Sequence, residues 1–485
     1  MRARRPPWPK VSAAFVQQNL TGHKILGLAV CALLYLICLS GTMTVFYLDL
    51  QRWEAGRAPD AVFTPQGVAA ALTDARAYQP KGTTALTAST PTHDAPRLTV
   101  GAGAVHRAYD SAGRYAGPAE TPATDGLTAL HYDLHLPVVG LTVVGLGGIA
   151  IAALLIGGLL AHPRIFKDAF LWRPRAGARL NRSDLHNRMG VWASPFHLAI
   201  AVTGALIGLA QIVVLVAGLS FYKGDTTAAG VPLFGDQTVK TAEGRMGPAE
   251  LATAFRTLKQ GFSDAEPNYV SLNNLGSDHE SLTVWADIPD RLAYGEAFEF
   301  DGKGHLVARH HLTDGSLGKQ AYASLYRLHF GSFGGIWVRW AYTALGMGLT
   351  LLCTTGMDIW LLKAAQKGRP HPRLHRFWTG FVWGAPVAIA AAAGLTAHWP
   401  NAFAAAFWGT LAVLAVGGLC LKSVEQASIV GRRLLAASLL ALVADHALRF
   451  GGIGATTWAV DVALLATALL SAGTVVRQPF IQMTR

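Results

Sequence analysis

Charged residues are scarce in this chain. They make up 14% of its 485 residues, whereas hydrophobic residues make up 51%. Several stretches of roughly twenty residues carry no charge, which is the length of a membrane-spanning helix. The formal net charge of +12 would suit nucleic-acid binding, but the basic residues cluster beside the apolar stretches, where they orient spans in the membrane. The composition therefore predicts a polytopic membrane protein that binds lipid and no nucleic acid.

Cysteine is also rare, and its placement excludes several redox and metal sites. The four cysteines all lie within apolar runs, and no CxxC or CxxCH motif occurs. This excludes a thioredoxin-like pair, a cysteine zinc cluster and covalently attached haem. The glycine-rich segments GLGGIA and GGIGA lie in or beside apolar stretches, without the strand and helix of a dinucleotide-binding unit. Any redox chemistry would therefore need an external electron donor.

Eight apolar stretches are predicted to cross the membrane, since a span needs about twenty residues at about 1.5 Å each. They are Ile25–Leu48, Pro137–Ala161, Gly190–Leu219, Trp337–Leu362, Phe377–Ala397, Phe403–Leu421, Leu434–Leu448 and Thr457–Val476. Basic residues before the first span and between Arg164 and Arg188 place the N- and C-termini in the cytoplasm. The span Leu434–Leu448 is short and carries Asp445, so it is the weakest of the eight.

Two polar segments between the spans are predicted to be small extracytoplasmic α+β domains, because each shows a helix pattern followed by hairpin signals. The domains predicted are 1–48 (cytoplasmic N-terminus and first span), 49–134 (first extracytoplasmic domain), 135–219 (second span, basic loop and third span), 220–328 (second extracytoplasmic domain), 329–365 (fourth span) and 366–485 (four further spans).

Residues 20–362 contain an internal repeat. Each half has a span with a histidine at its cytoplasmic start, an α+β domain, and a second span. A further histidine lies just outside the outer end of that second span. TGHKILGL matches DLHNRMGV, and HYDLHLPVVGL matches LYRLHFGSFGGI. The repeat predicts a mostly α fold, a duplicated four-helix bundle with its axis along the membrane normal. Such a bundle would bring His23 towards His186 and His135 towards His329.

Facing imidazoles inside an apolar helical bundle are typical ligands of a bis-histidine haem. The expected cofactor is haem b, with two sites: His23 with His186 near the inner face, and His135 with His329 near the outer face. Second-line candidate ligands are His131, His162 and His197. The alternative for any single histidine is an interfacial or capping residue.

For glycines and arginines in this region, a role in cofactor binding and a structural role are alternative interpretations. Gly145 and Gly148 in the second span would let a flat macrocycle approach the backbone, or let two helices pack closely. Arg173, Arg182 and Arg188 are topology determinants that could also bind haem propionates. His371, His375, His398 and His446 are expected at the membrane interface or in loops.

The segments GHKILGL, HYDLHLPVVGLTVVGLGG, DLHNRMGVWASPFH and LYRLHFGSFGGIWVRW resemble the PepSY-associated transmembrane helix family, from about residue 15 to residue 365. EAFEFDGKGHLVAR resembles the strand end of a PepSY module, although it lacks the usual Asp-x-x-Thr-Gly turn. The resemblance implies the inner membrane of a Gram-negative bacterium, with both domains in the periplasm. It also implies a haem-dependent ferric-chelate (ferrisiderophore) reductase for iron acquisition. Its partners would be a ferric siderophore or other ferric chelate, and a quinol or cytoplasmic reductase as electron donor.

Two other functions stay open from the sequence. One is a transporter or permease for iron or a metal chelate, with the histidines as transient ligands. The chain lacks paired intramembrane carboxylates for this, since Asp358, Asp445 and Asp461 are the only acids in or near the spans. The other is a PepSY-type regulatory scaffold. The last four spans lie outside the resemblance.

Overall fold

The computed structural model describes residues 12–56, 59–103, 105–161, 170, 173, 177–234, 244–289, 291–293, 295–450 and 457–473. The chain forms two compact units. The membrane unit comprises Met1–Tyr47, Pro122–Leu209 and Gly334–Arg485, and the sheet unit comprises Leu48–Thr121 and Ala210–Phe333.

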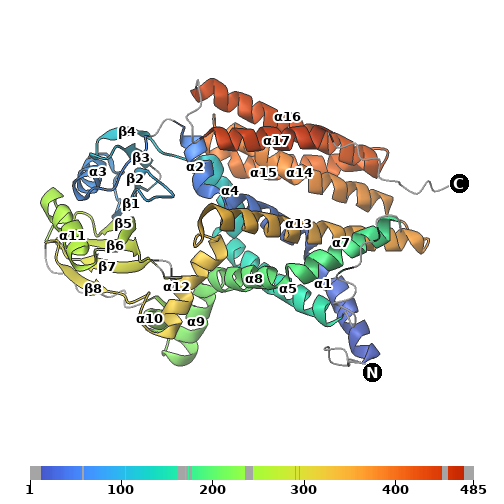
Figure 1. The fold of residues 1–485 in the computed structure, drawn as a ribbon, viewed down its shortest axis with the longest axis horizontal. Helices are drawn as coiled ribbons and strands as arrows, with labels where there is room; N and C mark the ends of the chain where they lie inside the picture. The colour runs from blue at the N-terminus through green and yellow to red at the C-terminus, as the bar shows by residue number, and fades with distance from the viewer. Residues whose placement is uncertain are drawn as a thin grey trace, which may run out of the picture. The chain divides into compact units, whose positions relative to one another are not determined.

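Four helical segments of the membrane unit pack as one bundle (Figure 1). They are α1 (Ala13–Thr44), α5 (Pro137–Leu160), the bent pair α7 (Ala178–Trp192) and α8 (Ser194–Gly208), and α13 (Gly335–Gln366). Helix α1 contacts α5 and α13, while α8 packs on α5 and α7 packs on α13. Leu34, Leu155, Ala201 and Leu349 meet in its buried core, one from each segment. The spans of the internal repeat therefore surround a common interior.

The third predicted span, Gly190–Leu219, is not one straight helix. The chain bends by 68° between α7 and α8, and the apolar helix α9 (Ala210–Phe221) belongs to the sheet unit. Pro195 occupies the first turn of α8, where proline lacks a backbone N–H and clashes with the preceding turn. The proline therefore marks the break.

The C-terminal region of the membrane unit consists of α14 (Pro372–Thr396), η1 (Pro400–Ala402), α15 (Phe403–Cys420), α16 (Val424–Phe450) and α17 (Trp458–Gly473), which run side by side in Figure 1. Among the described residues six helices are long and apolar enough to span a membrane, or seven with α7 and α8 as one span. Helix α16 is one of them. Helix α17 has 16 residues within the described part of the chain, and residues 474–476 of the eighth predicted span lie outside the described residues.

Tyr35 of α1 makes a polar contact with α14. Its hydroxyl donates to the carbonyl of Val382 at 2.7 Å. Pro386 stands four residues after Val382 inside α14 and has no N–H to donate to that carbonyl. Trp378 and Phe381 pack against the Tyr35 ring. The tyrosine thus satisfies an acceptor that the proline leaves open.

One eight-stranded antiparallel sheet organises the sheet unit, in the order β4-β3-β2-β1-β5-β6-β7-β8. The strands are β1 (Ala85–Ser89), β2 (Leu98–Ala102), β3 (Val105–Tyr109), β4 (Tyr115–Pro118), β5 (Glu266–Asn273), β6 (Ser281–Asp287), β7 (Glu296–Phe300) and β8 (Leu306–Arg309). Strands β1 and β5 pair directly, with Leu86 opposite Leu272. Helices α3 (Pro65–Tyr78) and α11 (Pro248–Gly261) contact each other and share the buried core with the sheet.

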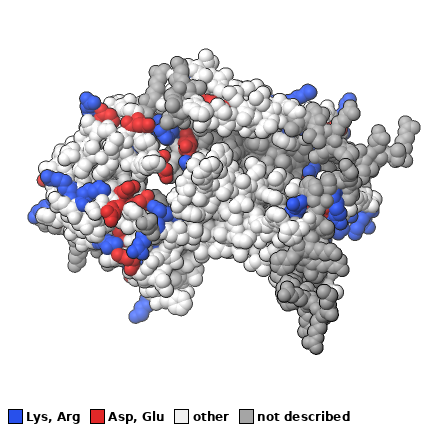
Figure 2. All heavy atoms as spheres, in the orientation of Figure 1, with Lys and Arg blue, Asp and Glu red and all other residues white. Residues whose placement is uncertain are grey.

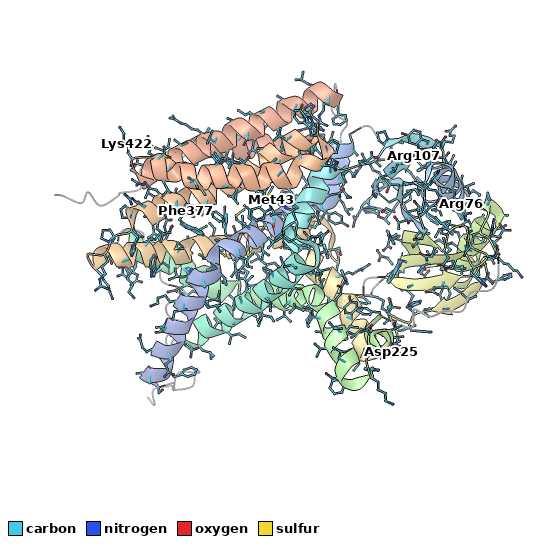
Figure 3. The ribbon with its side chains drawn as sticks, turned by 180° about the vertical axis from the view of Figure 1, so that it is seen from behind. Met43, Arg76, Arg107, Asp225, Phe377 and Lys422 are labelled. Carbon is cyan, nitrogen blue, oxygen red and sulfur yellow. The ribbon has the colours of Figure 1, made fainter. Side chains whose placement is uncertain are left out.

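The two segments that form this sheet repeat the same local structure. Asp110 Oδ1 accepts the N–H groups two and four residues later, and Asp301 Oδ1 does the same. Gly113 and Gly304 follow at φ +76° and +81°, conformations that suit glycine. Arg76 of α3, labelled in Figure 3, donates to the buried Glu280 beside β6 at 2.7 Å. The two segments, which were predicted to be separate domains, therefore form one sheet together.

Three helices complete the sheet unit. Helices α9 and α10 (Thr226–Phe234) form a hairpin whose turn contains Asp225, labelled in Figure 3; its carboxylate accepts the N–H of Ala228. Helix α12 (Leu317–Phe330) contacts α10. On the face drawn in Figure 2, many charged side chains lie over the sheet unit, whereas the middle of the long helices carries few. Helices α2 (Tyr47–Ala55) and α4 (Pro122–Tyr132) lie at the boundaries of the units in sequence, and α4 packs on α1.

Candidate functional site

Two histidines meet at the end of the bundle where α1 begins and α5 ends, which is called the inner end below. His23 lies on α1 and His186 on α7. Their ring centres are 6.3 Å apart and the ring planes are nearly perpendicular, at 87°. The structure thus brings together the pair that the internal repeat predicts.

Hydrogen bonds orient both imidazoles in the same way. His23 Nδ1 lies 3.0 Å from the Leu154 carbonyl oxygen, which only accepts, so Nδ1 carries the proton. His186 Nδ1 lies 3.0 Å from Thr355 Oγ1. Because the Thr355 hydroxyl donates to the Leu351 carbonyl at 2.7 Å, its oxygen accepts from His186. In both rings Nε2 then holds the lone pair, and a metal-bound histidine is commonly oriented in this way.

The ring spacing suits one metal ion between two imidazoles. Each metal–nitrogen bond is about 2 Å, which places the ring centres about 6 Å apart. Glycines flank both rings on the facing helices. A Cβ on Gly158 of α5 would lie 3.3 Å from His23 Cε1, and one on Gly356 of α13 would lie 3.5 Å from His186 Cε1. The donor set therefore fits a bis-histidine haem. Among the described residues no three or more His, Cys, Asp or Glu side chains form a metal cluster.

Two of the three candidate propionate-binding arginines have carboxylate partners. Arg173 binds the buried Asp184 through its backbone and guanidinium groups. Arg182 pairs with Asp358 of α13 at 3.3 Å. Asp184 therefore connects Arg173 with α7, and Asp358 connects α7 with α13. Arg188 lies over the ring of Trp192, 5.6 Å from its centre.

His135 is held by protein groups at both ring nitrogens. Nε2 donates to the Gly126 carbonyl at 2.8 Å, and Nδ1 accepts from the Trp408 indole at 3.2 Å. Its backbone has φ +60°, an uncommon conformation for a residue with a side chain. To bind a metal here, the ring would have to give up one of these two bonds. His329 lies on α12 in the sheet unit, so the pairing of His135 with His329 stays a prediction.

His131 and His197 are oriented towards two bundle helices. His131 Nδ1 donates to the Ile37 carbonyl of α1 at 3.0 Å, and His197 Nε2 donates to the Leu345 carbonyl of α13 at 3.0 Å. His197 is fully buried and its Nδ1 has no hydrogen-bond partner. An orphaned buried nitrogen of this kind makes His197 a candidate ligand at least equal to His135. His162 lies outside the described residues.

The glycines of α5 serve helix packing at two positions. A Cβ on Gly145 would lie 2.7 Å from Leu209 Cγ, and one on Gly148 would lie 2.7 Å from the Ala201 carbonyl oxygen of α8. The helix-packing alternative therefore accounts for Gly145 and Gly148.

Two features of the membrane unit were not predicted from the sequence. Thr355, which orients His186, carries no motif that separates it from the other threonines of its span. His446 was expected at the interface, but it is buried, and its Nδ1 lies 3.3 Å from the buried Asp461. The buried carboxylate explains the error, because a histidine with a charged partner is tolerated away from water.

Comparison with known proteins agrees with this architecture. The family described as PepSY-associated TM region matches residues 20–363. An uncharacterized protein of Pseudomonas aeruginosa is 29% identical over 284 residues, which cover 56% of this chain and 71% of that protein. With its apolar helices, the chain is a multi-pass membrane protein, and it belongs to the PepSY-associated TM region family.

Proposed function

We propose that this protein binds haem b between His23 and His186 and carries electrons across the bacterial inner membrane. The electrons would reach a ferric siderophore or another ferric chelate on the periplasmic side, in support of iron acquisition. A second haem would lie near the outer end of the bundle, where His131, His135 and His197 are the candidate ligands of the membrane unit; the internal repeat of the sequence adds His329 as a candidate. The basic residues of the sequence place the inner end of the bundle on the cytoplasmic side.

The observation that carries the proposal is the geometry of the inner pair. His23 and His186 come from opposite segments of the bundle, 6.3 Å apart, and each has its Nδ1 proton committed to a neighbouring oxygen. A histidine used only to cap a helix or reach the interface needs no such matched partner. Bound haem would supply one-electron iron redox chemistry at this position.

The chain's own residues would hold the imidazoles, exclude water and fix the distance between the inner and the outer haem sites. Leu34, Leu155 and Leu349 fill the bundle interior. At the outer side, reduction would release the substrate iron, since hard oxygen chelators hold Fe(II) less tightly than Fe(III).

The test is a reduced-minus-oxidised visible spectrum of the purified protein, followed by reduction of ferric citrate by protein in liposomes. Wild type should show a b-type α band. His23→Ala and His186→Ala should each lose the inner haem and most of the reductase activity. His371→Ala is the matched control, because it also removes an imidazole from the membrane unit, and that ring stacks on Trp360 and is not a proposed ligand. A wild type without an α band, or full haem content in both variants, would overturn the proposal.

A further inference from the structure

We propose that a groove between α1 and α5 binds a membrane quinol, which is the electron donor to the site at His23. This inference rests on the proposed function and identifies the class of its donor. The groove belongs to the membrane unit alone, because both of its walls are bundle helices.

The groove has a volume of about 360 Å³. It is lined by Phe15, Gln18, Asn19, Gly22, His23 and Leu26 of α1 and by Ala153, Leu154 and Gly157 of α5. Glycines on both walls keep it open. A Cβ on Gly22 would meet nothing within 4 Å, and one on Gly157 would come no nearer than 3.9 Å to Asn19 Oδ1.

The lining matches the two chemical parts of a quinol. Phe15, Leu26 and Leu154 offer apolar surface to a ring and the start of an isoprenoid tail. The amide of Gln18 offers a donor and an acceptor to the ring oxygens, and the amide oxygen of Asn19 offers a second acceptor, since its nitrogen donates to the Phe15 carbonyl at 3.2 Å. Small-molecule sites combine a mostly apolar lining with a few such polar groups. A lipid acyl chain, by contrast, would make no hydrogen bond with either amide.

The position of the groove along α1 and α5 also suits a lipid-soluble electron donor. The groove uses the last two turns of α5 and the part of α1 just before its apolar stretch. Quinol head groups reach this level from within the membrane. Gly22 and Ala153 are exposed on the helix surface, so the groove opens away from the bundle core.

His23 connects the groove with the haem site. It lines the groove and faces His186 on its other side, while its Nδ1–H is bonded to the Leu154 carbonyl on the groove wall. A bound quinol would thus stand one side chain away from the electron acceptor.

The reaction balances with the proposed substrate. Each quinol loses two O–H bonds and becomes a quinone, which gives up two electrons and two protons. The electrons leave one at a time past His23 and reduce two ferric ions to ferrous ions. The protons pass to water at the polar end of the groove near Gln18. His23 is not the proton acceptor, since Nδ1 already carries a proton and Nε2 would hold the haem iron.

The experiment fills the groove without disturbing the fold. Gly22→Leu and Gly157→Leu place side chains in the groove, because neither Cβ meets a close neighbour. Gly409→Leu on α15 is the matched control, since it is exposed and a Cβ there also meets nothing within 4 Å. Full-length protein in liposomes is reduced first with decylubiquinol and then with dithionite. A photoreactive azidoquinone provides a second readout that needs no haem turnover.

Wild type and Gly409→Leu should be reduced by the quinol, and the azidoquinone should label peptides that contain the groove residues. Both groove variants should be reduced at least tenfold more slowly and lose the label, with an unchanged dithionite-reduced spectrum. Equal quinol rates in all four proteins would overturn the inference. So would a wild type that dithionite reduces and quinol does not, which would point to a soluble reductase. A wild type with no b-type spectrum under dithionite would instead refute the proposed function.

Discussion

Thr355→Val tests whether the orientation of His186 serves metal binding. The substitution replaces a hydroxyl with a methyl group of similar size, so the packing between α7 and α13 is preserved. Thr355 Oγ1 lies 3.0 Å from His186 Nδ1 and its residue is buried, so the variant leaves the Nδ1 proton without its acceptor. Removing such an orienting partner usually costs 10- to 100-fold in metal affinity, which corresponds to about 1.4–2.7 kcal/mol.

The assay is a haem titration of apo-protein against a competing haem-binding protein. Thr354→Val is the matched control, because the neighbouring Thr354 is half-buried and its hydroxyl donates to its own helix at Leu351. We expect Thr354→Val to bind as wild type and Thr355→Val to bind 10- to 100-fold more weakly. Equal affinity in both variants would refute the role given to this hydrogen bond.

Two further predictions concern stability. Tyr35→Phe leaves the Val382 carbonyl without its donor and should cost about 1–3 kcal/mol of unfolding free energy. In a Pro386→Ala background, the restored N–H of residue 386 can donate to that carbonyl, so the same substitution should cost less. An equal cost in both backgrounds would contradict this explanation of the Tyr35 hydrogen bond. In the sheet unit, the hydrogen bond with Glu299 raises the pKa of His310, so its stabilisation is complete below the unfolded pKa of about 6.5 and is lost as pH rises through the folded value. Hydrogen-exchange protection factors around His310, which are corrected for the intrinsic rise of exchange with pH, should therefore fall above pH 6.5 in wild type and not in His310→Gln. The same pH profile of protection in both proteins would count against it.

The internal repeat allowed the proximity of His23 and His186 to be predicted from the sequence. Matching TGHKILGL with DLHNRMGV places two histidines at equivalent positions of a duplicated bundle, and His23 and His186 do lie together. Repetition constrains tertiary structure because equivalent segments take equivalent places around a pseudo-symmetry axis. The helix-then-hairpin order of each α+β segment was predictable for the same reason, down to the turns at Asp110 and Asp301.

Other features depend on contacts that no local pattern records. The direct pairing of β1 with β5 joins segments nearly two hundred residues apart in the chain, and edge pairing of this kind leaves no signal in either strand alone. The environment of His135 depends on Trp408, which lies beyond the repeat. The bend before α8 was readable from Pro195, but apolar composition favoured one long span.

Electron paramagnetic resonance of the oxidised protein shows whether His23 and His186 are both ligands of one haem iron. Axial imidazoles with nearly perpendicular planes give ferric haem a strongly anisotropic low-spin signal, and the rings of His23 and His186 are inclined at 87°. We predict that signal in wild type and its loss in both His23→Ala and His186→Ala. A wild type without that signal, or a signal unchanged in either variant, would contradict the assignment of these two histidines.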